Sequence, residues 1–174
     1  ASVPLELSIA RALVRAKLKV HLGAKTPEWK AFADSTKDAQ NARLDAIAEK
    51  RILVLDGAMG TMVQRFSLTE EDFRGERFHD HPKLLKGCND LLCLTKPGII
   101  ASIHQAYLRA GADIIETCSF NATSLSMSDY DLQDFAYEIN VAAARIARES
   151  VDLYSTRKKP RFVAGILGPT SVTA

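Results

Sequence analysis

The stretch RILVLDGAMGTM, residues 51–62, decides the fold class of this chain. Its first half is a short apolar run that contains β-branched residues, which is typical of a strand buried on both faces of a sheet. Asp56 and Gly57 end the run, because Asp-Gly is a common turn sequence. We therefore expect a strand at 52–55 that presents a polar, glycine-containing loop at its carboxyl end.

Two further runs of the same kind follow at residues 113–117 and 161–167, and Gly168-Pro169 closes the second of them. Between the strands, apolar residues recur at helical spacing over 97–110 and 132–154, and Gly111 occupies the usual capping position of the first helix. A short helical piece is expected at 69–73. Strands that alternate with helices pair in parallel, so the sequence predicts an α/β fold.

Residues 1–50 differ in pattern from the rest of the chain and predict a helical N-terminal extension, with helices at about 4–22 and 28–50. The first 25 residues carry five basic residues against a single acidic one. This composition resembles an organelle transit peptide, and it also suits a basic amphipathic helix that docks on a domain, which is the favoured interpretation. The domain organisation predicted is an extension at 1–50 followed by an α/β domain at 51–174.

Composition excludes several classes of function. The 174 residues carry a net charge of only +2, without the basic surface that tracks a phosphate backbone, so a nucleic acid partner is not expected. No apolar run approaches the roughly 20 residues that span a bilayer, so no membrane span is expected. Three cysteines are an odd number and too few for a disulfide scaffold, which favours a reducing compartment and a cytoplasmic location.

Ligands of parallel sheets bind at the carboxyl ends of the strands, so the loops at 56–61, 116–124 and 168–173 are the candidate site. Asp56 can pair with an ammonium group, and Gly57 lets a backbone N–H approach an anion closely. Hydroxyl groups in these loops can bind a carboxylate. Together these features suit the headgroup of an amino acid, and the candidate substrate-binding residues are Asp56, Gly57, Thr61, Glu116, Thr117, Ser119 and Phe120.

Each candidate also has an ordinary structural interpretation. Asp56-Gly57 is a sequence found in many simple turns, and Glu116 is equally compatible with a buried carboxylate bonded to loop backbone. Cys88, Cys93 and Cys118 lack a close metal-ligand spacing, so no metal site is expected within the chain.

Five collinear segments resemble a known family: ILVLDGAMGTMVQ (52–64), FRGERF (73–78), LKGCNDLL (85–92) with Lys96-Pro97 after it, AGADIIETCSF (110–120) and FVAGILGPT (162–170). Together they resemble the homocysteine-binding domain of the cobalamin-dependent methionine synthases, a branch of the homocysteine S-methyltransferase family. The resemblance covers about residues 45–174. Betaine-dependent enzymes belong to the same parent family, but FRGERF and LKGCNDLL are closer to the cobalamin-dependent branch.

The resemblance implies a (β/α)8 TIM barrel, of which this chain holds the N-terminal part with about three strands. It implies that Asp56 and neighbouring backbone N–H groups hold the amino acid end of L-homocysteine, with the loop from Glu116 to Phe120 lining the pocket. It also implies zinc held by three cysteines, expected beyond Ala174, and methylcobalamin recharged by methyltetrahydrofolate. The folate- and cobalamin-binding modules are then expected downstream in the same polypeptide, and no cofactor is expected on this fragment alone.

Two positions depart from the family pattern, because Cys88 and Cys118 stand where asparagine is usual. The fragment alone is expected to be inactive, since the zinc ligands are missing from it. Two other functions remain open: a zinc-dependent homocysteine or thiol S-methyltransferase with a small-molecule methyl donor, and a non-catalytic binding or assembly module.

Overall fold

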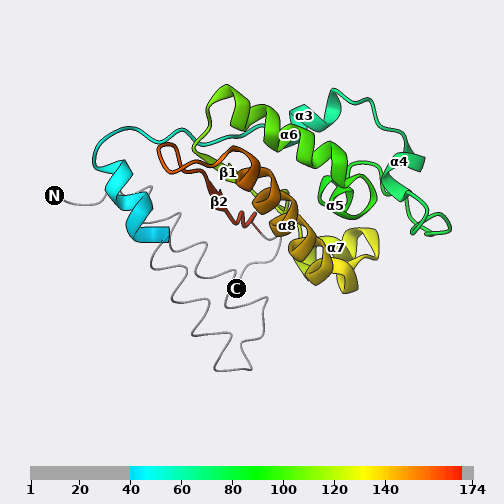
Figure 1. Ribbon diagram of the computed structural model, residues 1–174. Coiled ribbons are helices and arrows are strands. Elements are labelled where there is room, and N and C mark those ends of the chain that lie inside the picture. The colour runs from blue at the N-terminus through cyan, green and yellow to red at the C-terminus, as the bar shows by residue number, and fades with distance from the viewer. Residues whose placement is uncertain (1–39, 170–174) are drawn as a thin grey trace. The chain divides into compact units, whose positions relative to one another are not determined.

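The computed structural model describes residues 40–169 (Figure 1). The chain divides into two compact units, Ala1–Val54 and Leu55–Ala174. In the first unit, residues 40–48 form a helix, which is the described part of the helix expected at 28–50. The helix expected at 4–22 lies outside the described residues.

The second unit alternates helices with short strands, as the sequence predicts. The elements in chain order are α3 (Met59–Gln64), α4 (Glu70–Arg74), the 3-10 helix η1 (Asn89–Leu91), α5 (Leu92–Thr95), α6 (Pro97–Ala110), β1 (Ile114–Glu116), α7 (Ser124–Met127), the 3-10 helices η2 (Ser128–Tyr130) and η3 (Gln133–Phe135), α8 (Ala136–Tyr154) and β2 (Phe162–Ala164). None of the helices in the described part of the chain is long and apolar enough to cross a membrane.

The strands are parallel and adjacent in chain order. β1 pairs with β2 in the register Ile115 opposite Val163, and Leu55 forms a parallel bridge with Ile114 on the other side of β1. The backbone N–H of Asp56 extends this bridge by donating to the Ile114 carbonyl at 3.0 Å. The three apolar runs therefore lie side by side in the predicted parallel arrangement.

The strands are shorter than the sequence predicts, and the run at 52–55 is not a strand buried on both faces. It is reduced to the single bridge at Leu55, whose side chain is 49% exposed, and Ile52 is 88% exposed. An apolar run of sequence favours burial, but a strand is buried only where neighbouring elements cover it. Within the described residues, Leu55 has a bridging neighbour on one side only.

Both long helices form where they are expected. α6 begins with Pro97 in its first turn and ends at Gly111, whose positive φ of 115° lets its N–H return to the carbonyls of Tyr107 and Leu108. α8 follows η3, so the first residues of the expected helix 132–154 form a tighter turn before the regular helix starts. α6 and α8 pack against each other; α8 contacts both strands and α6 contacts β1 (Figure 1).

The core beneath the strands is small and apolar. Ile115 of β1 is fully buried against Leu108 of α6 and against Ala147 and Val151 of α8. Small alanines on α8 let its backbone approach the sheet closely, which leaves the carboxyl ends of β1 and β2 as the edge where loops can diverge.

Arg161 fixes the start of β2 beneath α6. The residue is 8% exposed, and its guanidinium group donates to the carbonyls of Leu108, Gly111 and Ala112 at the end of α6. Asp113 lies 3.8 Å from the same guanidinium group. The buried arginine therefore ties the end of α6 to the strand that follows α8.

Candidate functional site

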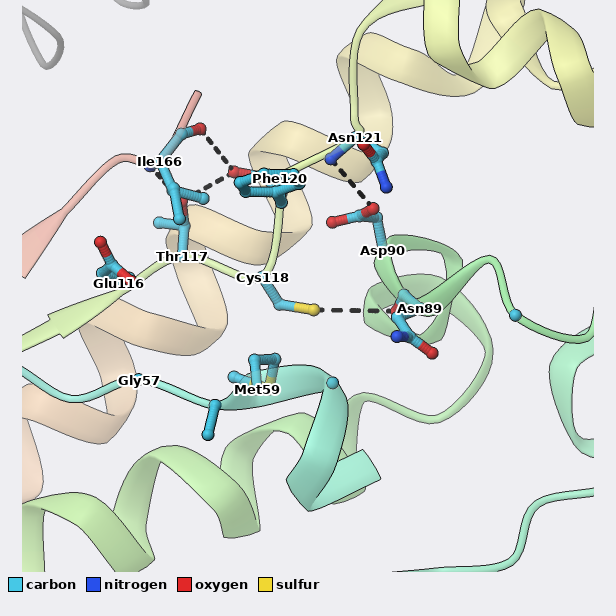
Figure 2. Close-up of a pocket in the computed structure, with 14 residues that line it drawn as sticks. Gly57, Met59, Asn89, Asp90, Glu116, Thr117, Cys118, Phe120, Asn121 and Ile166 are labelled. Carbon is cyan, nitrogen blue, oxygen red and sulfur yellow. Dashed lines mark hydrogen bonds between the residues drawn. The ribbon is translucent and has the colours of Figure 1, made fainter. Parts of the chain in front are cut away.

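A pocket of about 320 Å³ lies at the carboxyl ends of the two strands (Figure 2). Four separate segments line it: the loop into α3, the turn before η1, the loop after β1, and the segment after β2. The lining residues are Gly57, Ala58, Met59, Gly60, Gly87, Asn89, Asp90, Glu116, Thr117, Cys118, Ser119, Phe120, Asn121 and Ile166. This is the edge at which parallel sheets bind ligands, and it includes five of the seven candidate residues from the sequence.

Asp56 and Thr61 are the two candidates that do not line the pocket. Thr61 lies in α3 with its side chain exposed. The Asp56 side chain is only 3% exposed, because one carboxylate oxygen accepts the backbone N–H of Glu116 at 2.8 Å and the other lies 4.0 Å from His104 Nδ1. In this structure Asp56 therefore holds the loop before α3 against the end of β1, and its contact with a ligand stays a prediction.

Burial changes the protonation of Asp56. Desolvation raises the pKa of its carboxyl from 3.8 to about 7, with a further increase from the negative charge of Glu116, although the bond from the Glu116 N–H opposes this increase. A carboxyl with this pKa is largely protonated below neutral pH. Asp56 is therefore a poorer partner for an ammonium group than a solvated aspartate.

Glu116 and Asp90 are the two acidic residues in the described part of the chain that line the pocket, and of these Asp90 already accepts the Asn121 N–H. Glu116 is the last residue of β1, its side chain is partly buried, and no hydrogen bond to its carboxylate is found among the described residues. Burial raises its pKa modestly above the ordinary value. A partly desolvated carboxylate without a protein partner is suited to accept hydrogen bonds from a bound cation.

The hydroxyl groups of Thr117 and Ser119 form hydrogen bonds within and between the loops. Thr117 Oγ1 lies 2.7 Å from Ser119 Oγ and accepts the backbone N–H of Ile166 at 3.1 Å. Ser119 Oγ donates to the Ile166 carbonyl at 3.4 Å. These bonds connect the loop after β1 to the segment after β2 and so fix the pocket wall that the two segments share.

Phe120 and Gly168 meet closely at the same wall. The Gly168 N–H donates to the Phe120 carbonyl at 2.9 Å, and a Cβ atom at position 168 would lie 2.4 Å from that oxygen. Only glycine allows this approach without displacing the loop. Phe120 itself is 47% exposed and presents an aromatic surface at the pocket (Figure 2).

The sequence analysis did not select the wall formed by Gly87, Asn89, Asp90 and Asn121. The Asp90 carboxylate is buried and accepts the Asn121 N–H at 3.2 Å, which connects this wall to the loop after β1. Three of these residues belong to the LKGCNDLL segment, whose Gly-x-Asn-Asp sequence is the signal that points to this wall. Figure 2 shows Asn89 and Asp90 on the side of the pocket away from Glu116.

Two residues of α4 position this wall from outside the pocket. Glu70 accepts the backbone N–H groups of Leu85 and Lys86 at 2.7–3.1 Å and the Arg74 Nε at 2.7 Å. Burial alone would raise the pKa of Glu70, but these bonds lower it. The remaining Arg74 nitrogens donate to the carbonyls of four residues, Phe78, His79, His81 and Lys83. The charged part of FRGERF therefore fixes the long connection that leads into Gly87.

The three cysteines are buried thiols, and one of them, Cys118, lines the pocket. Cys93 Sγ donates to the Cys118 carbonyl at 3.4 Å, Cys118 Sγ to the Asn89 carbonyl at 3.7 Å, and Cys88 lies 3.9 Å from the Met127 sulfur. Desolvation raises the pKa of Cys88 to about 12, and the contact with Cys93 together with burial raises that of Cys118. A cysteine binds a metal as its thiolate, and the described residues contain no group of three potential ligands placed to hold an ion.

The pocket thus combines the Glu116 carboxylate at one side with the amide groups of Asn89 and Asn121 and the buried Asp90 carboxylate at the other, and Phe120 adds an aromatic surface. This combination suits a small molecule that carries both a positive and a negative group.

Comparisons with known proteins point to one family. Residues 53–174 match the family model described as homocysteine S-methyltransferase. Among solved structures, the chain is similar to the homocysteine methyltransferase MmuM from Escherichia coli. The metallated form matches with a TM-score of 0.56 and 24% sequence identity, over 72% of this chain and 41% of that chain. The oxidized form matches with a TM-score of 0.56 and 25% sequence identity, over 72% of this chain and 40% of that chain. The chain therefore spans about two fifths of the length of these solved relatives.

Proposed function

The chain belongs to the homocysteine S-methyltransferase family, and from this we infer that its pocket binds the amino acid end of L-homocysteine in an enzyme that methylates the homocysteine thiol. The observation that carries this proposal is the position of Glu116. Its carboxylate lines a pocket of suitable size and has no hydrogen-bond partner among the described residues. The pocket lies at the carboxyl ends of the strands, where such a fold binds its ligand. The chain contributes this part of the site, and the fold of the complete domain is proposed to be a (β/α)8 barrel.

The ligand is oriented by neighbouring groups at one side of the pocket, Glu116 and the backbone at Gly57. Glu116 accepts hydrogen bonds from the ammonium group, since a partly buried carboxylate forms strong charge-assisted bonds. Gly57 leaves room for the carboxylate end to approach the backbone, because no atom lies within 4 Å of the position where a Cβ would be. Asp56 acts indirectly, by holding Gly57 beside Glu116.

The finer proposal is a methionine synthase of the cobalamin-dependent branch, and it rests on the resemblance of FRGERF and LKGCNDLL. The described residues do not fit a zinc ion, because no three of their potential ligands are placed to hold one and burial raises the pKa of the Cys88 and Cys118 thiols. Zinc and methylcobalamin are therefore proposed to be held by other parts of a longer polypeptide, along with the folate-binding module. The described cysteines are free, which supports a reducing, cytoplasmic compartment.

Isothermal titration of the 174-residue chain with L-homocysteine, under reducing conditions, tests the proposed pocket. The chain should bind homocysteine, and Glu116→Gln should weaken binding at least tenfold, or about 1.4 kcal/mol, because it removes the charge and keeps the size of the side chain. The matched control is Glu149→Gln on the exposed face of α8, which should bind like the original chain.

A second ligand separates the role of Glu116 from the pocket itself. The deamino analogue 4-mercaptobutanoate lacks the ammonium group, so Glu116→Gln should leave its weaker binding unchanged. If the folded chain binds neither ligand, the pocket is not a homocysteine site and the non-catalytic module becomes the better interpretation. If homocysteine binds and Glu116→Gln has no effect, Glu116 is not the ammonium partner.

The methyl donor is tested by adding methylcobalamin or betaine with homocysteine and measuring methionine. The 174 residues alone should form none with either donor. Methionine from methylcobalamin would contradict the proposal that the fragment is inactive, and methionine from betaine would also contradict assignment to the cobalamin-dependent branch.

A further inference from the structure

His104 lies in the middle of α6, and its burial is unusual for a polar side chain. Its side chain is 0% exposed, and neither ring nitrogen has a hydrogen-bond partner in the structure. Buried imidazole nitrogens are normally paired, because an unpaired polar atom in the protein interior loses its hydration without compensation.

The Asp56 carboxyl group lies beside this imidazole. Asp56 Oδ2 is 4.0 Å from His104 Nδ1, and the Asp56 side chain is 3% exposed. The other oxygen, Oδ1, is already used by the Glu116 N–H. His104 Nδ1 is therefore a buried polar atom without a hydrogen-bond partner, and it faces the Asp56 oxygen that does not accept the Glu116 N–H.

Burial favours the neutral form of both groups. It raises the pKa of Asp56 to about 7 and lowers that of His104 to about 4. The third titratable group here, Glu116 at the end of β1, adds negative charge that also favours protonated Asp56. A neutral carboxyl group donates one hydrogen bond, and a neutral imidazole accepts one through its unprotonated nitrogen.

We propose that His104 is a positioning residue for Asp56, with Nδ1 accepting a hydrogen bond from the protonated Oδ2. Closing the 4.0 Å separation to hydrogen-bond distance requires a movement of about 1 Å. The bond holds Asp56 between α6 and the end of β1, and Asp56 in turn fixes the loop that brings Gly57 to the pocket. The pair belongs to the scaffold of the site and does not depend on which ligand the pocket binds.

An asparagine at position 56 reproduces this arrangement. Its Oδ1 accepts the Glu116 N–H, and its Nδ2 donates to His104 Nδ1 in place of the carboxyl proton. Leucine has a similar shape but can do neither. The two variants therefore separate the hydrogen bond from simple filling of space.

Imidazole nitrogen NMR on the 15N-labelled 174-residue chain tests the proposal without any ligand, so its result is independent of homocysteine binding. His104→Asn identifies the His104 signals, and exposed His79→Asn is the control. At pH 6, His104 should be neutral with its proton on Nε2 and Nδ1 as an acceptor. Asp56→Asn should preserve this tautomer, and Asp56→Leu should shift the Nδ1 signal.

Two results would overturn the proposal. One is protonation of His104 near pH 6.5, which would mean that the imidazole is charged or solvated. The other is an Nδ1 signal that does not respond to Asp56→Leu. If the leucine variant does not fold, the asparagine variant decides the question, because a changed tautomer in that variant is incompatible with a hydrogen bond from a protonated Asp56.

Discussion

Arg74 offers the sharpest test of how this chain builds the pocket wall. We expect Arg74→Met to destabilise the fold and to loosen the connection that leads to Gly87. The arginine side chain is 17% exposed and donates to Glu70 at 2.7 Å, to the His81 carbonyl at 2.5 Å and to the Lys83 carbonyl at 2.9 Å. Methionine keeps much of the apolar volume of the side chain and removes every donor.

The magnitude follows from these three short bonds. Each hydrogen bond to a charged group contributes about 1.5–3 kcal/mol when independent, but the three share one guanidinium group and water can replace part of them. A loss of about 3 kcal/mol in the free energy of unfolding is therefore expected. For a chain of this length, that corresponds to a decrease of roughly 6–12 °C in Tm.

Thermal unfolding followed by circular dichroism measures the global effect, and hydrogen exchange measures the local one. The amide protons of Leu85 and Lys86 should lose protection, because Glu70 accepts both and Arg74 holds Glu70. Arg148→Met is the matched control, since Arg148 makes an exposed pair with Asp152 on α8 that should contribute less than about 0.5 kcal/mol. The reasoning is refuted if the two variants unfold at the same temperature, or if Arg74→Met leaves both amides protected.

Three further perturbations have defined outcomes. In the folded chain the pKa of Asp56 is raised from 3.8 to about 7. The contribution of this group to folding stability is therefore fully present below pH 3.8 and is lost as the pH rises to about 7. Asparagine at position 56 cannot ionise. In urea unfolding titrations, the free energy of unfolding of Asp56→Asn should therefore rise relative to that of the original chain between pH 4 and pH 8, by at most about 4 kcal/mol. A difference between the two chains that does not change with pH would contradict the raised pKa. Gly168→Ala would place a methyl group 2.4 Å from the Phe120 carbonyl oxygen. Titration with homocysteine should therefore show weaker binding, and denaturant unfolding should show a loss of about 1–3 kcal/mol in the free energy of unfolding. Unchanged binding would exclude a role for this contact in the pocket. Arg161→Met removes the guanidinium donor from the carbonyls of Gly111 and Ala112, and denaturant unfolding should show a loss of about 2–4 kcal/mol in the free energy of unfolding. A loss below about 1 kcal/mol would mean that water replaces the guanidinium group.

The sequence determined the class and order of the elements because those depend on local patterns. Helical spacing and capping residues located α6 and α8, and three short apolar runs indicated parallel strands that the structure places side by side. The carboxyl ends of those runs marked the edge of the sheet where the pocket lies. The lengths of the strands did not follow, because pairing and burial depend on neighbouring elements.

The roles of individual site residues were decided by the tertiary structure. In sequence, Asp56 and Glu116 are two acids that each follow or end an apolar run, and nothing in the pattern distinguishes them. Folding brings the Glu116 N–H and His104 to Asp56, so Asp56 is buried with a raised pKa, while the Glu116 carboxylate is left facing the pocket. Such differences arise from contacts between residues far apart in the sequence, 60 positions for Asp56 and Glu116, which local sequence patterns do not encode.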